Sequence, residues 1–249
     1  MNFKHYKDIV NHYKVSCHTL PKIIGGGKGK LTDAVKANLK DTGKAILRSI
    51  YIDVFYKRKK EITSKYLDKG IDDEDKSISL YRKNNQIFTA KNTIEYSNDF
   101  IKGTPDLVLN TKKLKLVVDI KTCWDIWTYI GKTKEVAKKD YFWQLAGYSW
   151  LTGIKDIEIA YTLLSNSEYE MMREYERMKW SLGILEDGTE DTSQQLVDLE
   201  DKIRYNNTYD DIPEEKRLKV FKFEVKEEDY KTIENYVQLS REYLNKLKL

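Results

Sequence analysis

Hydrophobic and polar residues alternate along several short stretches in the middle of the chain. Alternation with a period of two is typical of strands that bury one face. Between residues 86 and 121 it predicts four strands, at QIFTA (86–90), TIEYS (93–97), DLVL (106–109) and KLKLVVDIK (113–121). Two further strands are predicted at KDIEIAYTLL (155–164) and LKVFKFEV (218–225).

Other segments repeat hydrophobic residues every three or four positions, which predicts amphipathic helices. One is predicted from Thr32 to about Thr63, and its hydrophobic face would carry Val35, Leu39, Ile46, Ile50 and Val54. A second is predicted over Ser64–Tyr81, and others over 135–151 and 227–247, with two charged helices inside 167–205. Residues 19–30 (TLPKIIGGGKGK) are predicted to form a glycine-rich loop.

The order of these elements predicts an α/β fold with a central mixed β-sheet flanked by helices. No internal repeat or linker divides the sequence, so we expect one domain over 1–249, with a helical N-terminal region and a helical excursion at 167–205. The chain has 249 residues, of which 40% are hydrophobic, and this is enough to form a substantial core.

Charge and cysteine content narrow the class of protein. Lys and Arg number 44 and Asp and Glu number 40, a net charge of +4 that permits a polyanionic partner without requiring one. With only Cys17 and Cys123, a four-cysteine zinc or iron–sulfur centre is excluded, and a reduced, cytoplasmic environment is expected. No hydrophobic run approaches the ~18 residues of a membrane span, so no membrane association is predicted.

The strand predicted at 113–121 carries charges where burial should be greatest. Side chains alternate between the faces of a strand, so Asp119 and Lys121 point the same way. If the preceding strand folds back through a tight turn at 112–113, the numbers of paired residues sum to 225 and Asp106 lies opposite Asp119. A longer loop would shift this register. A divalent cation such as Mg²⁺ would offset the cost of burying two carboxylates.

Two carboxylates, a lysine and a divalent cation form a site suited to phosphodiester hydrolysis. The metal would polarise a phosphoryl oxygen, while the ammonium would orient water and stabilise the developing negative charge. The alternative is purely structural: Asp119 and Lys121 would form a salt bridge within the strand, and Asp106 would cap the turn after Gly103-Thr104-Pro105.

A third acid is predicted to face the core. Glu74 shares a hydrophobic helical stripe with Leu67, Ile71, Ile78 and Tyr81, while its acidic neighbours fall off that stripe; these are Asp72, Asp73 and Asp75. A buried glutamate needs a partner, and a metal ion would be one. The alternative is a glutamate at the edge of the stripe that reaches solvent.

Amide and aromatic side chains are candidates for contacts with a nucleic acid. Gln144 and Tyr148 lie four residues apart and share a helix face, from which they could hold a phosphate or a base edge, although Tyr148 could also belong to the core. Trp124, Trp127 and Tyr129 follow Lys121 and would either stack on unpaired bases or cover the sheet.

Together these motifs resemble the PD-(D/E)XK nuclease superfamily, and within it the RecB-type and phage-exonuclease branch that includes lambda exonuclease and YqaJ-like proteins. The resemblance rests on Glu74 with its K-G-x-x-x-E approach, G-T-P-D (103–106), D-I-K (119–121) and Q-L-A-G-Y (144–148), and it is most specific over 64–165. It implies that the metal ligands are Glu74, Asp106, Asp119 and the carbonyl of Ile120. Lys121 would be the catalytic lysine, and Gln144 and Tyr148 would bind the substrate.

The function implied by this resemblance is a Mg²⁺-dependent DNA exonuclease of phage or mobile-element recombination, repair or processing, with Mn²⁺ as a substitute metal. An endonuclease of the same superfamily is the first alternative, and an idle DNA-binding or virion-associated protein on a nuclease fold is the second. The resemblance implies DNA as a partner. It also suggests a single-strand annealing protein as a second partner, and self-association into a homo-oligomer. The serine-rich N-terminal motif of the family is replaced here by VSCHTLPKII, so Ser16, His18 and Thr19 stay open as DNA contacts.

Overall fold

The computed structural model describes residues 9–25, 38–60, 65–184 and 189–247, with the side chains of 65–68 and 190 left aside. At its centre is a sheet of four strands in the order β4-β5-β6-β7. These strands are β4 (Leu107–Asn110), β5 (Lys115–Cys123), β6 (Asp156–Leu163) and β7 (Leu218–Glu224). The inner pair is parallel and both outer pairs are antiparallel, so the predicted mixed α/β sheet is confirmed.

The register between β4 and β5 is the one that sets the two predicted aspartates together. Leu107 pairs with Val118 and Asn110 with Lys115, so the residue numbers of each pair sum to 225. The turn between the strands is tight, because the backbone N–H of Thr111 donates to the carbonyl of Leu114 at 2.9 Å. Continuing this register by one position brings Asp106 opposite Asp119.

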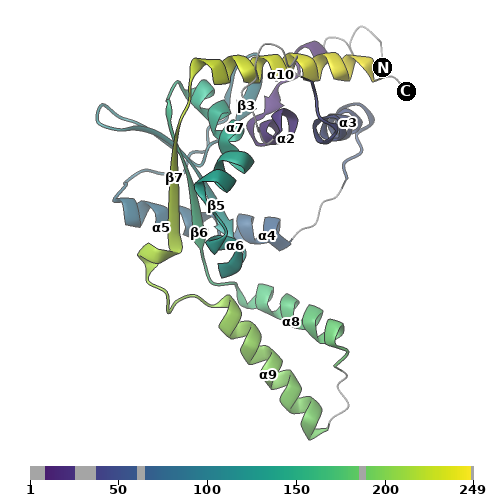
Figure 1. Ribbon diagram of the computed structural model, residues 1–249, viewed down its shortest axis with the longest axis vertical. Helices are drawn as coiled ribbons and strands as arrows, with labels where there is room; N and C mark the ends of the chain where they lie inside the picture. The colour runs from purple at the N-terminus through teal and green to yellow at the C-terminus, as the bar shows by residue number, and fades with distance from the viewer. Residues whose placement is uncertain (1–8, 26–37, 61–64, 185–188, 248–249) are drawn as a thin grey trace.

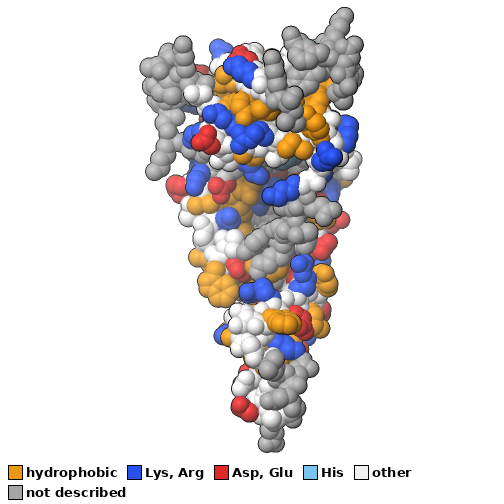
Figure 2. All heavy atoms as spheres, turned by 90° about the vertical axis from the view of Figure 1, so that its right-hand side faces the viewer, with side chains coloured by type: hydrophobic (Ala, Val, Ile, Leu, Met, Phe, Trp, Pro, Cys, Tyr) orange, Lys and Arg blue, Asp and Glu red, His pale blue; other side chains and the backbone are white. Residues whose placement is uncertain are grey.

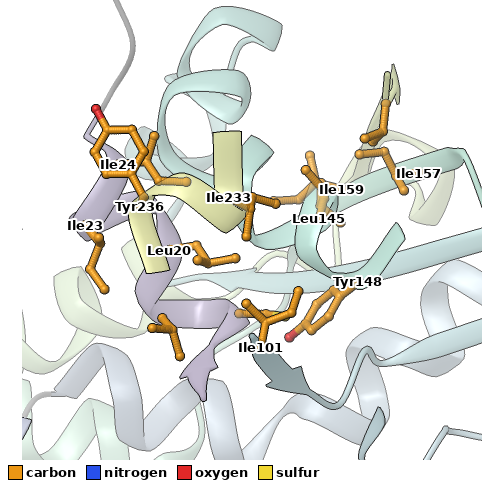
Figure 3. Close-up of a cluster of buried hydrophobic side chains, with 14 of the residues drawn as sticks. Leu20, Ile23, Ile24, Ile101, Leu145, Tyr148, Ile157, Ile159, Ile233 and Tyr236 are labelled. Carbon is orange, nitrogen blue, oxygen red and sulfur yellow. The ribbon is translucent and has the colours of Figure 1, made fainter. Parts of the chain in front are cut away.

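Helices cover both faces of the central sheet (Figure 1). On one face, α5 (Glu74–Asn85) packs Ile78 and Tyr81 against Val118 and Ile120 of β5. On the other face lie the crossover helix α7 (Lys134–Thr152) and the C-terminal helix α10 (Glu227–Lys246). Figure 3 shows the core on that side, where side chains from α2, α7, α10 and β6 meet; they include Leu20, Leu145, Ile159 and Ile233.

A small second sheet has the strand order β1-β3-β2 and lies next to α7. Its strands are β1 (Val15–Ser16), β2 (Tyr96–Ser97) and β3 (Ile101–Gly103). The predicted strand at 86–90 is wrong, because these residues form no strand and Phe88 is 98% exposed. The predicted strand at 93–97 is reduced to β2, and the pattern did not predict β1 or β3.

The N-terminal helices differ from the prediction. The helix expected over 32–63 is α3 (Asp41–Tyr56), whose most buried positions are Gly43, Leu47 and Tyr51, while Ile46, Ile50 and Val54 are half-buried. Residues 32–37 and 61–63 lie outside the described residues. The predicted loop at 19–30 begins instead with the 3₁₀ turn η1 (Cys17–Thr19) and helix α2 (Leu20–Ile24), and its glycine-rich part from 26 onward lies outside the described residues.

The helix predicted over 64–81 is two helices, α4 (Lys65–Asp72) and α5, separated at Asp73. The backbone of Asp73 leaves helical geometry, with φ −101° and ψ 3°. The side chain of Lys69 fixes the junction, since its ammonium donates to the carbonyls of Trp124 (3.3 Å) and Leu164 (2.8 Å) and to Oδ1 of Asn166. This buried lysine ties α4 to the ends of β5 and β6.

The remaining predicted helices are confirmed as α7, α8 (Glu168–Leu182), α9 (Glu190–Asn207) and α10. In Figure 1, α8 and α9 lie side by side as an arm at the end of the molecule opposite α10. Two short elements were not predicted, α6 (Ile126–Ile130) and η2 (Glu214–Arg217). Within the described part of the chain, we find no helix with the length and hydrophobicity needed to cross a membrane.

Candidate active site

The three charged residues of the G-T-P-D and D-I-K motifs meet at β5. Asp119 is 1% exposed, and its Oδ2 lies 2.8 Å from Nζ of Lys121. The backbone N–H of Ile120 donates to Oδ2 of Asp106 at 2.6 Å, which holds this carboxylate against the strand. The structure therefore brings together Asp106, Asp119 and Lys121, as the sequence predicted. The salt bridge of the structural alternative is also present, so geometry by itself does not separate the two interpretations.

The cluster has two carboxylates, Asp106 and Asp119, and one cation, Lys121, so the negative charge is not fully neutralised. Burial, followed by the negative charge of Asp119, raises the pKa of Asp106 from 3.8 to about 7. Burial lowers the pKa of Lys121, but the charges of Asp119 and Asp106 outweigh this effect and raise it overall. Lys121 is therefore a cation at neutral pH, while Asp106 is partly protonated near that pH.

Helix α7 places an amide and two phenols beside Asp119. Nε2 of Gln144 donates to Oδ1 of Asp119 and to the hydroxyl of Tyr148, both at 3.0 Å. The bond from Gln144 orients Asp119. Gln144 and Tyr148 are each 5% exposed, and their predicted binding of substrate stays a prediction. Nζ of Lys121 lies 5.6 Å from the ring centroid of Tyr141, which is three residues before Gln144 on the same helix face. Sequence reasoning missed Tyr141, although this spacing could have indicated it.

Close packing between α7 and β3 fixes the position of Tyr148. A Cβ atom on Gly103 would lie 2.6 Å from the Tyr148 ring, and one on Gly147 would lie 2.8 Å from Sγ of Cys17. Both glycines therefore allow an approach that a side chain would block. In Figure 3 the Tyr148 ring lies next to Ile101 of β3. The glycines of the G-T-P-D and Q-L-A-G-Y motifs are thus explained by packing.

Glu74 lies at the edge of the predicted stripe and not in its buried part. Its side chain is 37% exposed and forms an ion pair with Lys91 at 2.7 Å. The buried acid of this segment is Asp73, which is 3% exposed and pairs with Lys76 at 2.7 Å. Ile78 and Tyr81 follow Glu74 on the same face of α5, but the break at Asp73 makes Glu74 the first residue of that helix, at the end of the buried stripe. The residue that the break takes off the stripe is Ile71 of α4, which is 66% exposed. The edge position that reaches solvent, weighed as the alternative for Glu74, is the one observed.

The donor set of the cluster fits a hard divalent cation. Mg²⁺ takes one or two carboxylates and fills its other positions with water and phosphate, so Asp106, Asp119 and the Ile120 carbonyl would suffice as protein ligands. A cation there would also supply the positive charge whose shortage raises the pKa of Asp106. In the described residues no group of three His, Cys, Asp or Glu side chains is close enough to hold a metal. Glu74 would have to leave Lys91 to complete such a group.

The N-terminal segment that replaces the serine motif lies close to the cluster. Thr19 is buried, whereas Ser16 Oγ and His18 Nδ1 form an exposed pair at 2.7 Å. Burial lowers the pKa of His18, and the charges of Lys22 and Lys121 lower it further. Of the three residues left open by the sequence, Ser16 and His18 are the accessible ones.

Comparison with known proteins identifies relatives by structure. No family model matches the sequence, and a search of curated proteins finds no match. A phage-related exonuclease from Haemophilus somnus 129PT has a TM-score of 0.71 and 25% sequence identity, over 94% of this chain and 94% of that one. An alkaline exonuclease (LHK-Exo) from Laribacter hongkongensis, also known in complex with dAMP, has a TM-score of 0.56 and 13% identity, over 97% and 92% of the two chains.

Proposed function

We propose that this chain, which has the fold of these exonucleases and the motifs of lambda-exonuclease-like PD-(D/E)XK nucleases, is a metal-dependent deoxyribonuclease that acts as an exonuclease. The observation that carries the proposal is the meeting of Asp106, Asp119 and Lys121 on a sheet of this fold. Two acids that share one lysine in a nearly buried site are costly, and a metal ion used for phosphodiester hydrolysis accounts for them.

The protein groups divide the chemical work between them. Asp106, Asp119 and the Ile120 carbonyl would hold Mg²⁺ or Mn²⁺, which when bound polarises a phosphoryl oxygen and lowers the pKa of water. Because its pKa is raised, Lys121 acts as a charged donor: it orients the attacking water and stabilises negative charge in the transition state. The amide of Gln144 keeps Asp119 in one orientation. Glu74 is a candidate further ligand once the metal competes with Lys91.

Two further parts of the proposal depend on the neighbours. DNA is the proposed substrate because both neighbours are described as exonucleases, and one has been studied in complex with the nucleotide dAMP. A role in phage or mobile-element recombination or repair is proposed because one neighbour is described as phage-related. An annealing protein and self-association stay predictions from the resemblance.

A digestion assay tests the proposal. Linear duplex DNA labelled at its 5′ or 3′ ends and covalently closed circular DNA would be incubated with Mg²⁺, with Mn²⁺ or with EDTA. We expect nucleotides to be released from the linear DNA only with metal, and the circle to stay intact. Cleavage of the circle would make the protein an endonuclease, and binding without cleavage would favour the idle DNA-binding alternative. A protein that does not bind DNA and does not cleave it would overturn the proposal.

A further inference from the structure

Three aromatic residues follow Lys121, and the structure separates their roles. Trp124 and Tyr129 are 8% and 3% exposed and cover the end of the sheet. Trp127, between them on α6, is 65% exposed. Trp127 is three residues from one buried aromatic residue and two from the other, yet most of its indole contacts solvent and adds little to the core. This leaves the ring available to a partner.

Helix α6 is held firmly at both ends. Oδ1 of Asp125 accepts from the backbone N–H of Thr128 at 2.7 Å, which caps the start of the helix. The ammonium of Lys219, on β7, donates to three carbonyls at the other end, those of Tyr129 (2.9 Å), Ile130 (3.0 Å) and Lys132 (3.3 Å). Trp127 is therefore presented from a fixed support, which lowers the entropy lost when it binds a partner.

A continuous series of contacts connects α6 with the candidate active site. Nζ of Lys121 lies 5.6 Å from the Tyr141 ring, the rings of Tyr141 and Tyr161 are 6.2 Å apart, and Nζ of Lys132 lies 5.3 Å from the Tyr161 ring. Lys132 comes two residues after the end of α6. The helix thus lies at the end of β5 that carries Lys121, within a few side chains of the cluster.

The charges beside α6 favour a polyanion as the partner. Between 131 and 141 the sequence has four lysines and two acids; they are Lys132, Lys134, Lys138 and Lys139, against Glu135 and Asp140. By comparison, Trp180 is 82% exposed on α8, where the charges nearly balance: Glu168, Glu170, Glu174 and Glu176 stand against Arg173, Arg177 and Lys179. Elsewhere, the face shown in Figure 2 carries lysine and arginine side chains interspersed with acids, without a patch of one sign. An exposed ring with neighbouring lysines matches the combination by which proteins bind single strands, through base stacking and phosphate pairing.

We propose that Trp127 stacks on a base of an unpaired DNA strand adjacent to the scissile phosphate, and that Lys132 and its neighbouring lysines contact the phosphates of that strand. This inference rests on the proposed nuclease function and makes the substrate more specific. It assigns to Trp127 a contact that holds an unpaired segment next to Asp119 and Lys121.

Binding measurements with a matched control test the inference. Fluorescence anisotropy would follow a labelled single-stranded oligonucleotide in Ca²⁺, used in place of Mg²⁺ to limit cleavage. Because Trp127→Ala loses one base stack, we expect it to bind about 5- to 150-fold more weakly, while Trp127→Phe keeps most of the affinity. Trp180→Ala removes an even more exposed indole, on the arm, and should bind like the wild type. Thermal melting would verify that each variant is folded.

Oligonucleotides with a single abasic position distinguish stacking from a general loss of affinity. In the wild type, one abasic position should weaken binding, and Trp127→Ala should remove that sensitivity because the stacking partner is already absent. In turnover experiments Trp127→Ala should raise KM and leave kcat nearly unchanged. If Trp127→Ala bound with wild-type affinity, or if both proteins were equally sensitive to the abasic site, the inference about Trp127 would be overturned. The proposed nuclease function would not be affected by either result. A wild-type protein that neither binds nor cleaves DNA would overturn both proposals.

Discussion

Replacing Lys121 by alanine separates a catalytic role of this lysine from a structural one. The substitution removes an ammonium that lies 2.8 Å from Oδ2 of Asp119, whose side chain is 2% exposed. Two consequences follow from the geometry. The reaction loses a charged donor beside the scissile phosphate, and the protein without metal keeps two buried carboxylates that no cation neutralises.

The structure sets the expected size of each effect. One preorganised donor is typically worth ~10²–10³ in rate, and a group that also moves a proton ~10²–10⁴. Breaking a buried ion pair usually costs about 3–5 kcal/mol of stability. Because the Lys121 side chain is 31% exposed and Asp106 can take up a proton, we expect the lower end of that range or less.

Single-turnover cleavage of end-labelled DNA at saturating Mg²⁺ would be measured together with thermal melting, with and without the metal. Lys222→Ala is the matched control: Nζ of Lys222 lies 3.0 Å from Oε1 of Glu158, another buried carboxylate, but outside the candidate site. Lys222→Ala should lose less stability than Lys121→Ala, because Lys222 is 80% exposed and Glu158 still accepts from the hydroxyl of Tyr81. Only Lys121→Ala should lose the chemical step while still binding metal and DNA. If Mg²⁺ restored both the stability and the activity of Lys121→Ala, the lysine would only neutralise Asp119, and its catalytic role would be refuted.

Two further predictions concern the other acids. Glu74→Gln should weaken Mg²⁺ binding and activity, while Asp72→Asn, at an exposed neighbouring position, should change neither. Isothermal titration with Mg²⁺ measures the binding, and a larger loss in Asp72→Asn than in Glu74→Gln would remove Glu74 from the site. The raised pKa of Asp106 favours its protonated form in the folded state, so the stability of the metal-free protein should fall as pH rises from about 4 to about 7, on the order of a few kcal/mol. Melting in EDTA at pH 5 and pH 8 measures this difference, and an equal slope in Asp106→Asn would assign it to other groups.

The part of the site on β4 and β5 could be predicted because local patterns determine it. Alternation predicted the shared face of Asp119 and Lys121, while the sequence left the register open between a tight turn and a longer loop. The structure has the tight turn, in which the numbers of paired residues sum to 225. In that register Asp106 falls next to Asp119 whatever the rest of the chain does. The pairing of Gln144 with Tyr148 also follows from one local rule, the spacing of four residues on a helix.

The position of Glu74 could not be predicted, because it depends on contacts between distant residues. The interruption at Asp73 is stabilised when Lys69 binds carbonyls more than fifty residues away, and the sequence contains no sign of this contact. Lys91, the partner of Glu74, directly follows residues 86–90, whose alternating pattern suggested a strand. That pattern was misleading because Phe88 faces solvent, and residues 86–90 pair with no strand among the residues that the structure describes.

The small sheet was missed for a related reason. Strands of two or three residues, such as β1 and β3, are too short to show a period of two. Val15 and Ile101 are nevertheless fully buried, because tertiary packing against α7 selects them. Conversely, the exposure of Trp127 between two buried aromatics required the structure, since all three residues are equally hydrophobic in sequence.

Replacing Asp119 by asparagine tests the central claim most directly, because the change removes one ligand charge and keeps the side-chain volume. Its remaining oxygen can still accept from Gln144, so the fold and the affinity for DNA should be preserved. The measurement is the release of nucleotides from end-labelled linear DNA in Mg²⁺, with DNA affinity followed by anisotropy on the same samples. We predict that the variant binds DNA and releases no nucleotides. Release at the wild-type rate would contradict the assignment of Asp119, and with it the proposed site.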